Sequence, residues 1–448
     1  MPEPLKPMIV PLCRKRTESP PPEHGDSSPP AVKKIRRVAP SQSFADVLQE
    51  MPANVLVNKP ASSFDASNML KEALVFQYVD IQRNQLQNRP VVLIFGVTEK
   101  GTRVLVHVVT SDLLLSRTQG PVDGFLEHYK TKAMTWMEIP PSKFKPVTES
   151  ERLSHNQVEF VVQHDDIIFH PPEGPWAKSA PLRILSFDIE AMIAPDNGMP
   201  RYDHEPIIQI GNMLAMNGAP YPYNRSIFTL NTCSPIDGAE VKSFDSESAM
   251  LLAWRDFVVE TDPDLIIGYN IGKFDFPQLI LRAEIFGLDQ FPYLGRLKGA
   301  RATAKKLPAN KRYSKDAPIL AGRLQLDVMQ HMQEGTVERT TKERTPTGKP
   351  KCDLNTVSFE FLGKRKEEIH YMKINPLQLG STEDRKQLAV YCLNDANLPL
   401  KLLECQKLRC LEESTDAARA NPQYMYKPFG QFLRNGRNPP PPQRQVYY

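Results

Sequence analysis

Residues 182–190 read LRILSFDIE, a short apolar run that ends in two carboxylates. Its composition is typical of a buried strand. Because side chains alternate between the faces of a strand, a spacing of two places Asp188 and Glu190 on one face. Adjacent carboxylates repel each other and lose hydration there, and a bridging hard cation such as Mg²⁺ or Mn²⁺ removes this cost. The stretch alone leaves open a strand that emerges into solvent with both acids hydrated.

The overall composition sets broad limits on the class of protein. The 448 residues leave room for two or three domains, and the net charge of +4 permits a nucleic-acid partner without requiring one. No apolar run approaches the length of a membrane span, and the N-terminus lacks the apolar core of a signal peptide, so we expect no membrane association. The six cysteines form no CxxC pair. We therefore expect reduced thiols in an intracellular protein without a zinc module.

The patterning divides the chain into four parts. Residues 1–60 form a basic and Pro-rich tail that we expect to be disordered, apart from a short amphipathic helix at 44–51 that docks on another element. The tail contains a basic cluster, Lys33, Lys34, Arg36 and Arg37, which is typical of a nuclear localisation signal and also of a solvated charge run. Residues 61–180 form an incomplete β-rich domain, residues 181–408 an α/β domain, and residues 409–448 an unstructured tail.

The α/β part begins with three strands joined by turns, which we expect to be antiparallel neighbours. These strands are 182–190, 205–214 and 225–231. A helix at 246–260 precedes a fourth strand at 264–270, which allows a parallel crossover. Further helices are expected at 274–288, 354–363 and 382–408, the last capped by Thr382, and a fifth strand is expected at 322–332.

Two further aspartates join the first pair in this arrangement. Asp275 follows the fourth strand, and Asp395 lies on the apolar face of the last helix, one turn after Tyr391. Ligands gather at the carboxyl ends of parallel strands. Four carboxylates can hold two divalent ions about 4 Å apart, and the tyrosine hydroxyl could orient a water.

Each of these three residues also has a structural explanation. Asp275 could be a helix cap, and Tyr391 could be a core residue whose hydroxyl bonds to backbone. Asp395 could pair with Lys401 or with a distant arginine.

Three motifs carry a family resemblance. FDIE, GYNIGKFDFPQLILRA and YCLNDANLPLKLL resemble the three exonuclease motifs of B-family DNA polymerases. HPPEGPWAKSAPLRILSFDIE, DPDLIIGYNIGKFDFP and LAVYCLNDANLPL are similar to that family over longer runs, so the resemblance covers roughly residues 76–403. It implies an RNase H-like mixed sheet and a 3′→5′ proofreading exonuclease that acts on nuclear DNA.

The resemblance also implies residue roles. Asp188, Glu190, Asp275 and Asp395 would be ligands of two Mg²⁺ or Mn²⁺ ions, and Tyr391 would position the water. Asn270 and Phe274 would contact the end of the strand.

The sequence departs from the family in three places. The β-rich domain is shorter, no DxxSLYPS-like or YGDTDS-like polymerase motif follows Asp395, and the cysteine-rich modules that hold an iron–sulfur cluster and accessory subunits are absent. We therefore expect no polymerase activity, no iron–sulfur or zinc module, and no accessory-subunit region in this chain, which is similar to a truncated product.

Three functional hypotheses follow. The first is a metal-dependent 3′→5′ exonuclease on single-stranded or mispaired DNA ends, with residues 298–323 as either a basic channel wall or a solvated loop. The second is a non-catalytic DNA-binding or defunct fragment. The third is an exoribonuclease, since the same carboxylate chemistry serves RNA.

Overall fold

The computed structural model describes most of the chain between residues 43 and 418. The described residues are 43–54, 71–86, 89–109, 134–171, 173–196, 198–304, 318–335, 343–346, 348, 350–363 and 369–418. The basic cluster at Lys33–Arg37 and the predicted disordered stretches before residue 43 and after residue 418 lie outside them. None of the described helices is long and apolar enough to cross a membrane.

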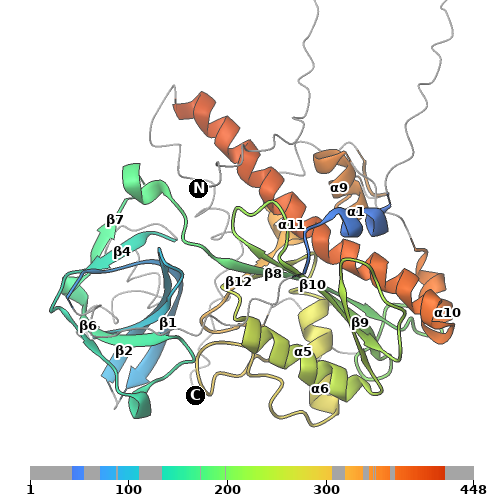
Figure 1. Cartoon of the computed structure of the whole chain (residues 1–448), viewed down its shortest axis with the longest axis horizontal. Coiled ribbons are helices and arrows are strands. Elements are labelled where there is room, and N and C mark those ends of the chain that lie inside the picture. The colour runs from blue at the N-terminus through green and yellow to red at the C-terminus, as the bar shows by residue number, and fades with distance from the viewer. Residues whose placement is uncertain are drawn as a thin grey trace, which may run out of the picture. The chain divides into compact units, whose positions relative to one another are not determined.

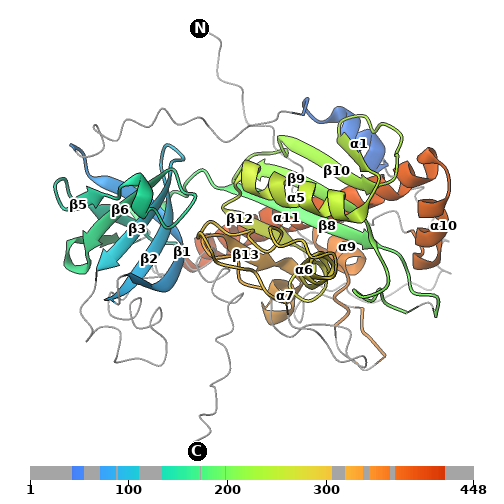
Figure 2. The ribbon, with the colours of Figure 1, turned by 90° about the horizontal axis from the view of Figure 1, so that it is seen from below.

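The β-rich part is one strongly curved sheet of seven strands, in the order β5-β6-β3-β2-β1-β4-β7 (Figure 2). Its strands are β1 (Leu74–Leu86), β2 (Arg89–Thr98), β3 (Arg103–Val109), β4 (Trp136–Ile139), β5 (Phe144–Pro146), β6 (Val158–Gln163) and β7 (Ile168–His170). Short 3-10 turns lie at η1 (Glu149–Glu151), η2 (His164–Asp166) and η3 (Gly174–Ala177).

Both faces of the sheet are buried at β2, which explains the unbroken apolar run of this strand. Phe76, Ile94 and Val106 pack in a core of the sheet itself. Leu93 and Phe95 belong instead to a core that also contains residues of the α/β part. The two parts therefore share buried surface.

The α/β part is a six-stranded mixed sheet in the order β11-β10-β9-β8-β12-β13. Its strands are β8 (Arg183–Ala191), β9 (Ile207–Met216), β10 (Asn224–Leu230), β11 (Glu240–Phe244), β12 (Leu265–Gly268) and β13 (Leu324–Asp327). The expected antiparallel pairing of β8, β9 and β10 is confirmed, as is the parallel crossover to β12. The mixed α/β fold is therefore as predicted.

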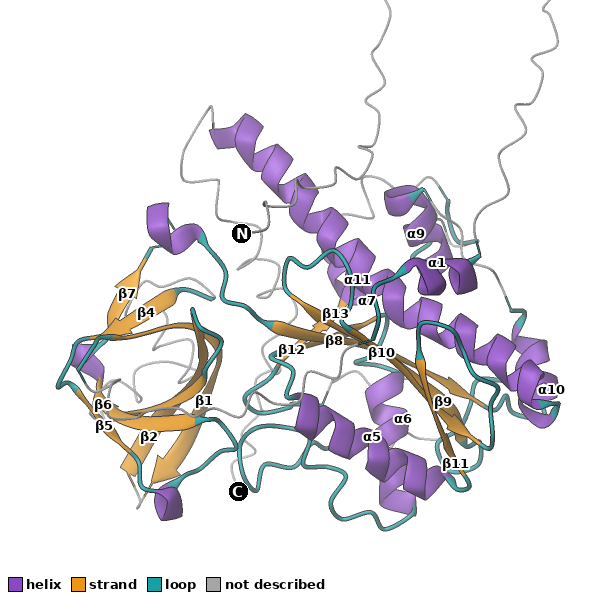
Figure 3. Cartoon of the chain, viewed as in Figure 1, coloured by secondary structure: helices purple, strands orange, loops and turns teal. Residues whose placement is uncertain are grey.

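Helices cover both faces of this sheet (Figures 1 and 3). α5 (Glu247–Thr261) and α6 (Asp275–Ile285) lie on one face, and the long α11 (Thr382–Ala418) crosses the other. The remaining helical elements are α7 (Val328–Gly335), α9 (Leu354–Leu362), η4 (Tyr371–Lys373) and α10 (Ile374–Leu379).

Several boundaries differ from the sequence prediction. The expected strand at 322–332 ends at Asp327, where the chain turns into α7. β11 was not predicted, because its polar sequence EVKSF lies at the sheet edge. Ser381 rather than Thr382 caps α11, since its hydroxyl accepts from the Asp384 amide. The predicted tail from residue 409 begins as helix, because α11 extends to Ala418.

The predicted helix at 44–51 is confirmed as α1 (Phe44–Glu50), and it docks as expected. Phe44 and Leu48 are buried in the core that the two parts share. Just beyond the helix, Asn54 forms a reciprocal pair with the backbone of Arg225 on β10, with distances of 2.7 and 2.8 Å. The Arg225 side chain donates to the Pro52 carbonyl. The predicted tail at 1–60 therefore contains an ordered clasp at residues 43–54.

A buried ionic network joins the β-rich part to the α/β part. Arg103 on β3 donates to both carboxylate oxygens of Asp264, which precedes β12, at 3.2 and 2.8 Å. Arg296 also donates to Asp264, at 2.7 Å, and both Arg296 and Arg323 donate to Asp262. Opposite charges and hydrogen bonds compensate the desolvation of these groups, and the network fixes β3 against the strand that precedes Asp275.

Candidate functional site

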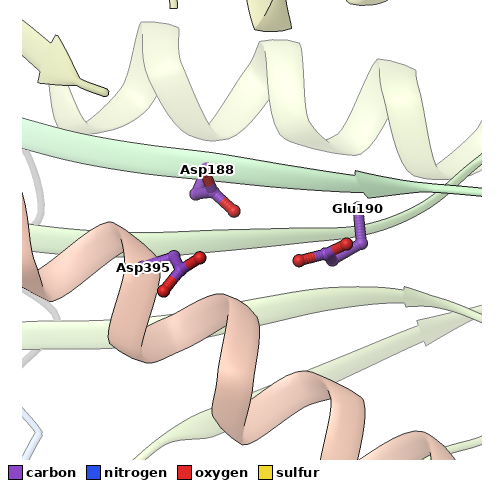
Figure 4. Close-up of side chains that lie close together, drawn as sticks. All are labelled: Asp188, Glu190 and Asp395. Carbon is purple, nitrogen blue, oxygen red and sulfur yellow. The ribbon is translucent and has the colours of Figure 1, made fainter. Parts of the chain in front are cut away.

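Strand β8 supplies the first two carboxylates of the site. Asp188 lies opposite Gly211 of β9 in the ladder, and Glu190 lies opposite Gln209. Both acids face the side of the sheet that α11 covers (Figure 4). Glu190 is buried and Asp188 is half-buried. The open alternative of a strand that emerges into solvent is therefore wrong.

Helix α11 supplies the third carboxylate. Asp395 is 7% exposed and points toward β8 from the buried side of the helix (Figure 4). The helix approaches closely because Gly211 has no side chain: a Cβ there would lie 2.9 Å from the backbone oxygen of Cys392. The glycine thus lets the helix backbone rest on β9 beside Asp188, a role that was not predicted from the sequence.

These elements bring three predicted ligands together. One carboxylate oxygen from each of Asp188, Glu190 and Asp395 lies within 4.8 Å of the others. These three acids also affect the neighbouring thiol of Cys392. Burial is the largest cause that raises the pKa of Cys392 well above its ordinary value, and the negative charges of the three acids add to it. The Cys392 sulfur lies 3.5 Å from the Asp188 carbonyl oxygen.

Asp275 lies beside this group without being one of the three. It occupies the first turn of α6, and its Oδ1 accepts from the Ile189 amide at 3.1 Å, between the two β8 acids in sequence. The N-cap of α6 is Phe274, so the explanation of Asp275 as a helix cap is wrong. Burial, together with the charges of Asp327 and Asp395, raises the pKa of Asp275 to about 8. The group is therefore costly to ionise in the absence of a cation.

Asp327, which terminates β13, is a site residue that was not predicted from the sequence. Its carboxylate accepts from the amides of Asn270 and Gly272 at 2.9 and 3.1 Å and so fixes the turn that leads into Asp275. Burial raises the pKa of Asp327. The rule that functional groups gather at the carboxyl ends of parallel strands could have found it, had the strand not been extended to residue 332.

The other predicted residues lie around this centre. Tyr391 is half-buried one turn before Asp395 and packs against a small apolar cluster that includes Ile374 and Leu388. Asn270 adopts a left-handed φ of 68° in the turn after β12. Phe274 is half-buried at the N-cap of α6. Tyr391 thus lies on the same helix as Asp395, and Asn270 and Phe274 lie in the segment that leads into Asp275.

Two basic residues, Arg323 and Lys401, form contacts other than the ones suggested for them. Arg323 is buried in the ionic network and cannot line a solvent channel, so that part of the prediction for residues 298–323 is wrong. Lys305, Lys306, Lys311, Arg312 and Lys315 lie outside the described residues. Lys401, a suggested partner of Asp395, donates to the Pro220 carbonyl at 3.3 Å.

The donor set fits a hard divalent cation. Carboxylate oxygens are the ligands that Mg²⁺ and Mn²⁺ prefer, and here they are held on rigid elements. The buried Gln209, opposite Glu190, donates its Nε2 to the Arg385 carbonyl, whereas its Oε1 accepts no hydrogen bond from the described residues. A hydrated cation beside Glu190 would offer a donor to that oxygen.

The geometry and the comparisons with known proteins define the same class of domain. Residues 125–341 match the family "DNA polymerase family B, exonuclease domain". The chain therefore carries an exonuclease domain of DNA polymerase family B.

Three curated relatives, all DNA polymerase delta catalytic subunits, are similar to this chain. The Candida albicans protein is 41% identical over 313 residues, covering 69% of this chain and 28% of the relative. The Oryza sativa subsp. japonica protein is 42% identical over 63% of this chain and 25% of the relative, and the Mesocricetus auratus protein is 40% identical over 67% and 26%. The chain thus spans about a quarter of the length of these relatives.

A solved structure has the same fold. The family B DNA polymerase from the hyperthermophilic archaeon Pyrobaculum calidifontis aligns with a TM-score of 0.50 and 19% identity, covering 74% of this chain and 45% of that chain.

Proposed function

We propose that this chain is a metal-dependent 3′→5′ exonuclease that removes terminal nucleotides from single-stranded or mispaired DNA ends. The observation that carries the proposal is the convergence of Asp188, Glu190 and Asp395 within 4.8 Å in a family B exonuclease domain. Asp275 would complete the ligand set by contributing from the first turn of α6. Two Mg²⁺ or Mn²⁺ ions held by these residues would stabilise both the attacking and the leaving oxygen of the phosphodiester.

The chain's own residues would position the substrate. Tyr391 lies one turn before Asp395, so its hydroxyl would orient the attacking water. Asn270 and Phe274, in the turn between β12 and α6, would contact the terminal nucleotide. The left-handed backbone of Asn270, held by Asp327, presents that turn at the edge of the acidic group.

The direct test is digestion of a 5′-labelled primer with a 3′ mismatch, annealed to a template, in Mg²⁺. We expect stepwise loss of 3′ nucleotides, and we expect chelator or Asp188→Ala to reduce the rate by at least ~1,000-fold, because several kcal/mol of charge stabilisation are lost. Asp256→Ala is the matched control, since Asp256 is an exposed carboxylate on α5 that pairs with Arg255 outside the site.

The same assay separates the alternatives. Binding without digestion by a folded chain would overturn the exonuclease proposal and favour a DNA-binding fragment. Faster digestion of an RNA 3′ end than of a DNA end would replace it with an exoribonuclease. Primer extension after addition of deoxynucleotides would contradict the prediction that this chain lacks polymerase activity.

A nuclear location is part of the same proposal. The basic cluster at Lys33, Lys34, Arg36 and Arg37 would be its signal. Replacing these four residues by alanine in a fluorescent fusion should redistribute the protein to the cytoplasm, and unchanged nuclear retention would contradict this assignment.

A further inference from the structure

A short turn ahead of α11 exposes an aromatic and a thioether side chain. Tyr371 is 47% exposed and Met372 is 55% exposed, although both belong to a well-defined 3-10 turn, η4. The His370 ring stacks on Tyr371 with 4.5 Å between centroids. The Met372 amide donates to Nδ1 of His370, which orders the ring. Large apolar groups that are both exposed and ordered are candidates for a binding surface.

Two contacts connect this turn to the acidic site. Asn375, which follows the turn, forms a reciprocal pair with the backbone of Ile193: it accepts from the amide at 2.8 Å and donates to the carbonyl at 2.9 Å. Ile193 lies three residues beyond Glu190. Ile369, immediately before the turn, packs against the same cluster as Tyr391. The turn is therefore fixed to the segment that follows β8, and it packs on the same cluster as Tyr391 of α11.

The acidic site requires additional groups nearby that bind the DNA strand, and this turn carries suitable side chains. A DNA strand brings phosphates toward Asp188, Glu190, Asp275 and Asp395, so carboxylates alone cannot supply affinity for the strand. Unpaired nucleotides bind through stacking of bases on aromatic side chains and through cations near their phosphates. Tyr371, with His370 stacked on it, offers an aromatic face for a base, and the exposed Lys373 in the same turn offers a cation for a phosphate. Stacking is tolerant of sequence, as removal of any terminal nucleotide requires.

We propose that residues 370–373 form a stacking subsite for an unpaired nucleobase of the strand whose 3′ end occupies the acidic site. This inference rests on the exonuclease function proposed above and adds a place for a base upstream of the cleaved bond. Tyr371 provides the stacking face, His370 supports the ring from the other side, and Lys373 faces the backbone of the same strand. A protein partner is the less favoured occupant, because the turn offers one aromatic face and a cation rather than an extended apolar groove.

The experiment measures binding without hydrolysis. In the Asp188→Ala background, the affinity for a fluorescent single-stranded oligodeoxynucleotide is compared for Tyr371→Ala, Tyr371→Trp and Tyr221→Ala. Tyr221 is the matched control, because it is a tyrosine of similar exposure, 39%, beside Lys401. We expect Tyr371→Ala to weaken binding by about 5- to 20-fold, the lower range for loss of one stacked base. Tyr371→Trp should retain affinity, and Tyr221→Ala should leave it unchanged.

Oligonucleotides with one abasic site at successive positions from the 3′ end identify the contact. If Tyr371 stacks on one base, its replacement by alanine should have no further effect on the oligonucleotide that lacks this base, because the two changes remove the same interaction. An effect of Tyr371→Ala that is equal for every abasic position would overturn the stacking subsite. Equal affinities of Tyr371→Ala and Tyr221→Ala for the intact oligonucleotide would also overturn it.

Failure of this inference can be told apart from failure of the proposed function. If the chain with its native site digests DNA but Tyr371→Ala binds normally, only the subsite is wrong. If the chain neither digests nor binds DNA, the function is wrong and the subsite falls with it. Thermal unfolding of each variant confirms that binding is compared between folded chains. Retained DNA affinity together with a loss of self-association in Tyr371→Ala would assign the turn to a protein interface instead.

Discussion

Gly211 on β9 and Cys392 on α11 are in such close contact that a side chain on the glycine would displace the helix. A Cβ at residue 211 would lie 2.9 Å from the Cys392 carbonyl oxygen and 3.0 Å from its sulfur. Gly211 is the ladder partner of Asp188, and Cys392 precedes Asp395 by three residues. This one contact therefore sets the gap across which the β8 and α11 carboxylates face each other.

We expect Gly211→Ala to separate those carboxylates. The added methyl group meets backbone atoms that cannot rotate away, so α11 must shift, and overpacking of this kind costs about 1–3 kcal/mol. Binding of Mn²⁺, followed by electron paramagnetic resonance, should weaken at least ~10-fold, and nuclease activity should fall with it. Gly218→Ala is the control: Gly218 has a φ of +81° but no neighbour within 4 Å, so its replacement costs stability without moving α11. Equal Mn²⁺ affinity of Gly211→Ala and the native chain would contradict this role.

The raised pKa of Asp275, about 8, predicts how stability depends on pH in the absence of metal. The folded chain holds this proton between about pH 4 and about pH 8, whereas the unfolded chain releases it near the ordinary aspartate value. The contribution of Asp275 to stability is therefore present at low pH. It declines as pH rises through this window, by up to about 1.4 kcal/mol per pH unit.

Denaturant unfolding in chelator at about pH 5 and about pH 7.5 measures this contribution. Asp275→Asn should make stability less dependent on pH, because the amide does not titrate. Saturating Mg²⁺ should reduce the dependence in the native chain, since a bound cation favours the ionised carboxylate. A native chain and an Asp275→Asn variant with the same pH slope in chelator would disprove the assignment.

The ionic network between the two parts predicts a large difference between two acid-to-alanine substitutions. Asp264 is fully buried and bonded to Arg103 and Arg296, so Asp264→Ala removes the counter-ion of Arg103 and leaves Arg296 with Asp262 alone. We expect a loss of about 3–5 kcal/mol in unfolding free energy. Glu99→Ala breaks an exposed pair with Lys178 and should cost less than about 1 kcal/mol. Chemical denaturation compares the two, and similar costs would show that the network contributes little.

The sequence predicted the centre of the fold because its strongest elements are locally consistent. The apolar stretch LRILSFDIE forms a strand wherever it is buried. The apolar residues around Asp395 recur at helical spacing, and an aspartate on that apolar face must contact other polar groups. The polar edge strand β11 could not be predicted, because its pairing with β10 depends on the tertiary fold. Gly211 also gave no signal, since a close approach between distant elements leaves no local pattern.

Asp327 was hidden for a different reason. The strand and the following helix share apolar spacing across QLDVMQHM, so the point where one becomes the other is ambiguous in sequence. The carboxylate that marks this point is fixed by four backbone amides, including those of Met329 and Gln330 at 3.1 and 3.3 Å. The role of Asp327 in holding the loop that precedes Asp275 becomes apparent only from the three-dimensional structure of that turn.

The clasp at residues 43–54 changes where a self-contained folding unit of this chain begins. A fragment that starts at residue 181 follows the boundary that the sequence suggests, but it would strip Leu48 from the core and remove the acceptors that Pro52 and Asn54 offer to Arg225. It would also remove Arg103 from Asp264. Transplanting the α/β part into another polypeptide therefore means moving everything from residue 43 onward, including the curved sheet.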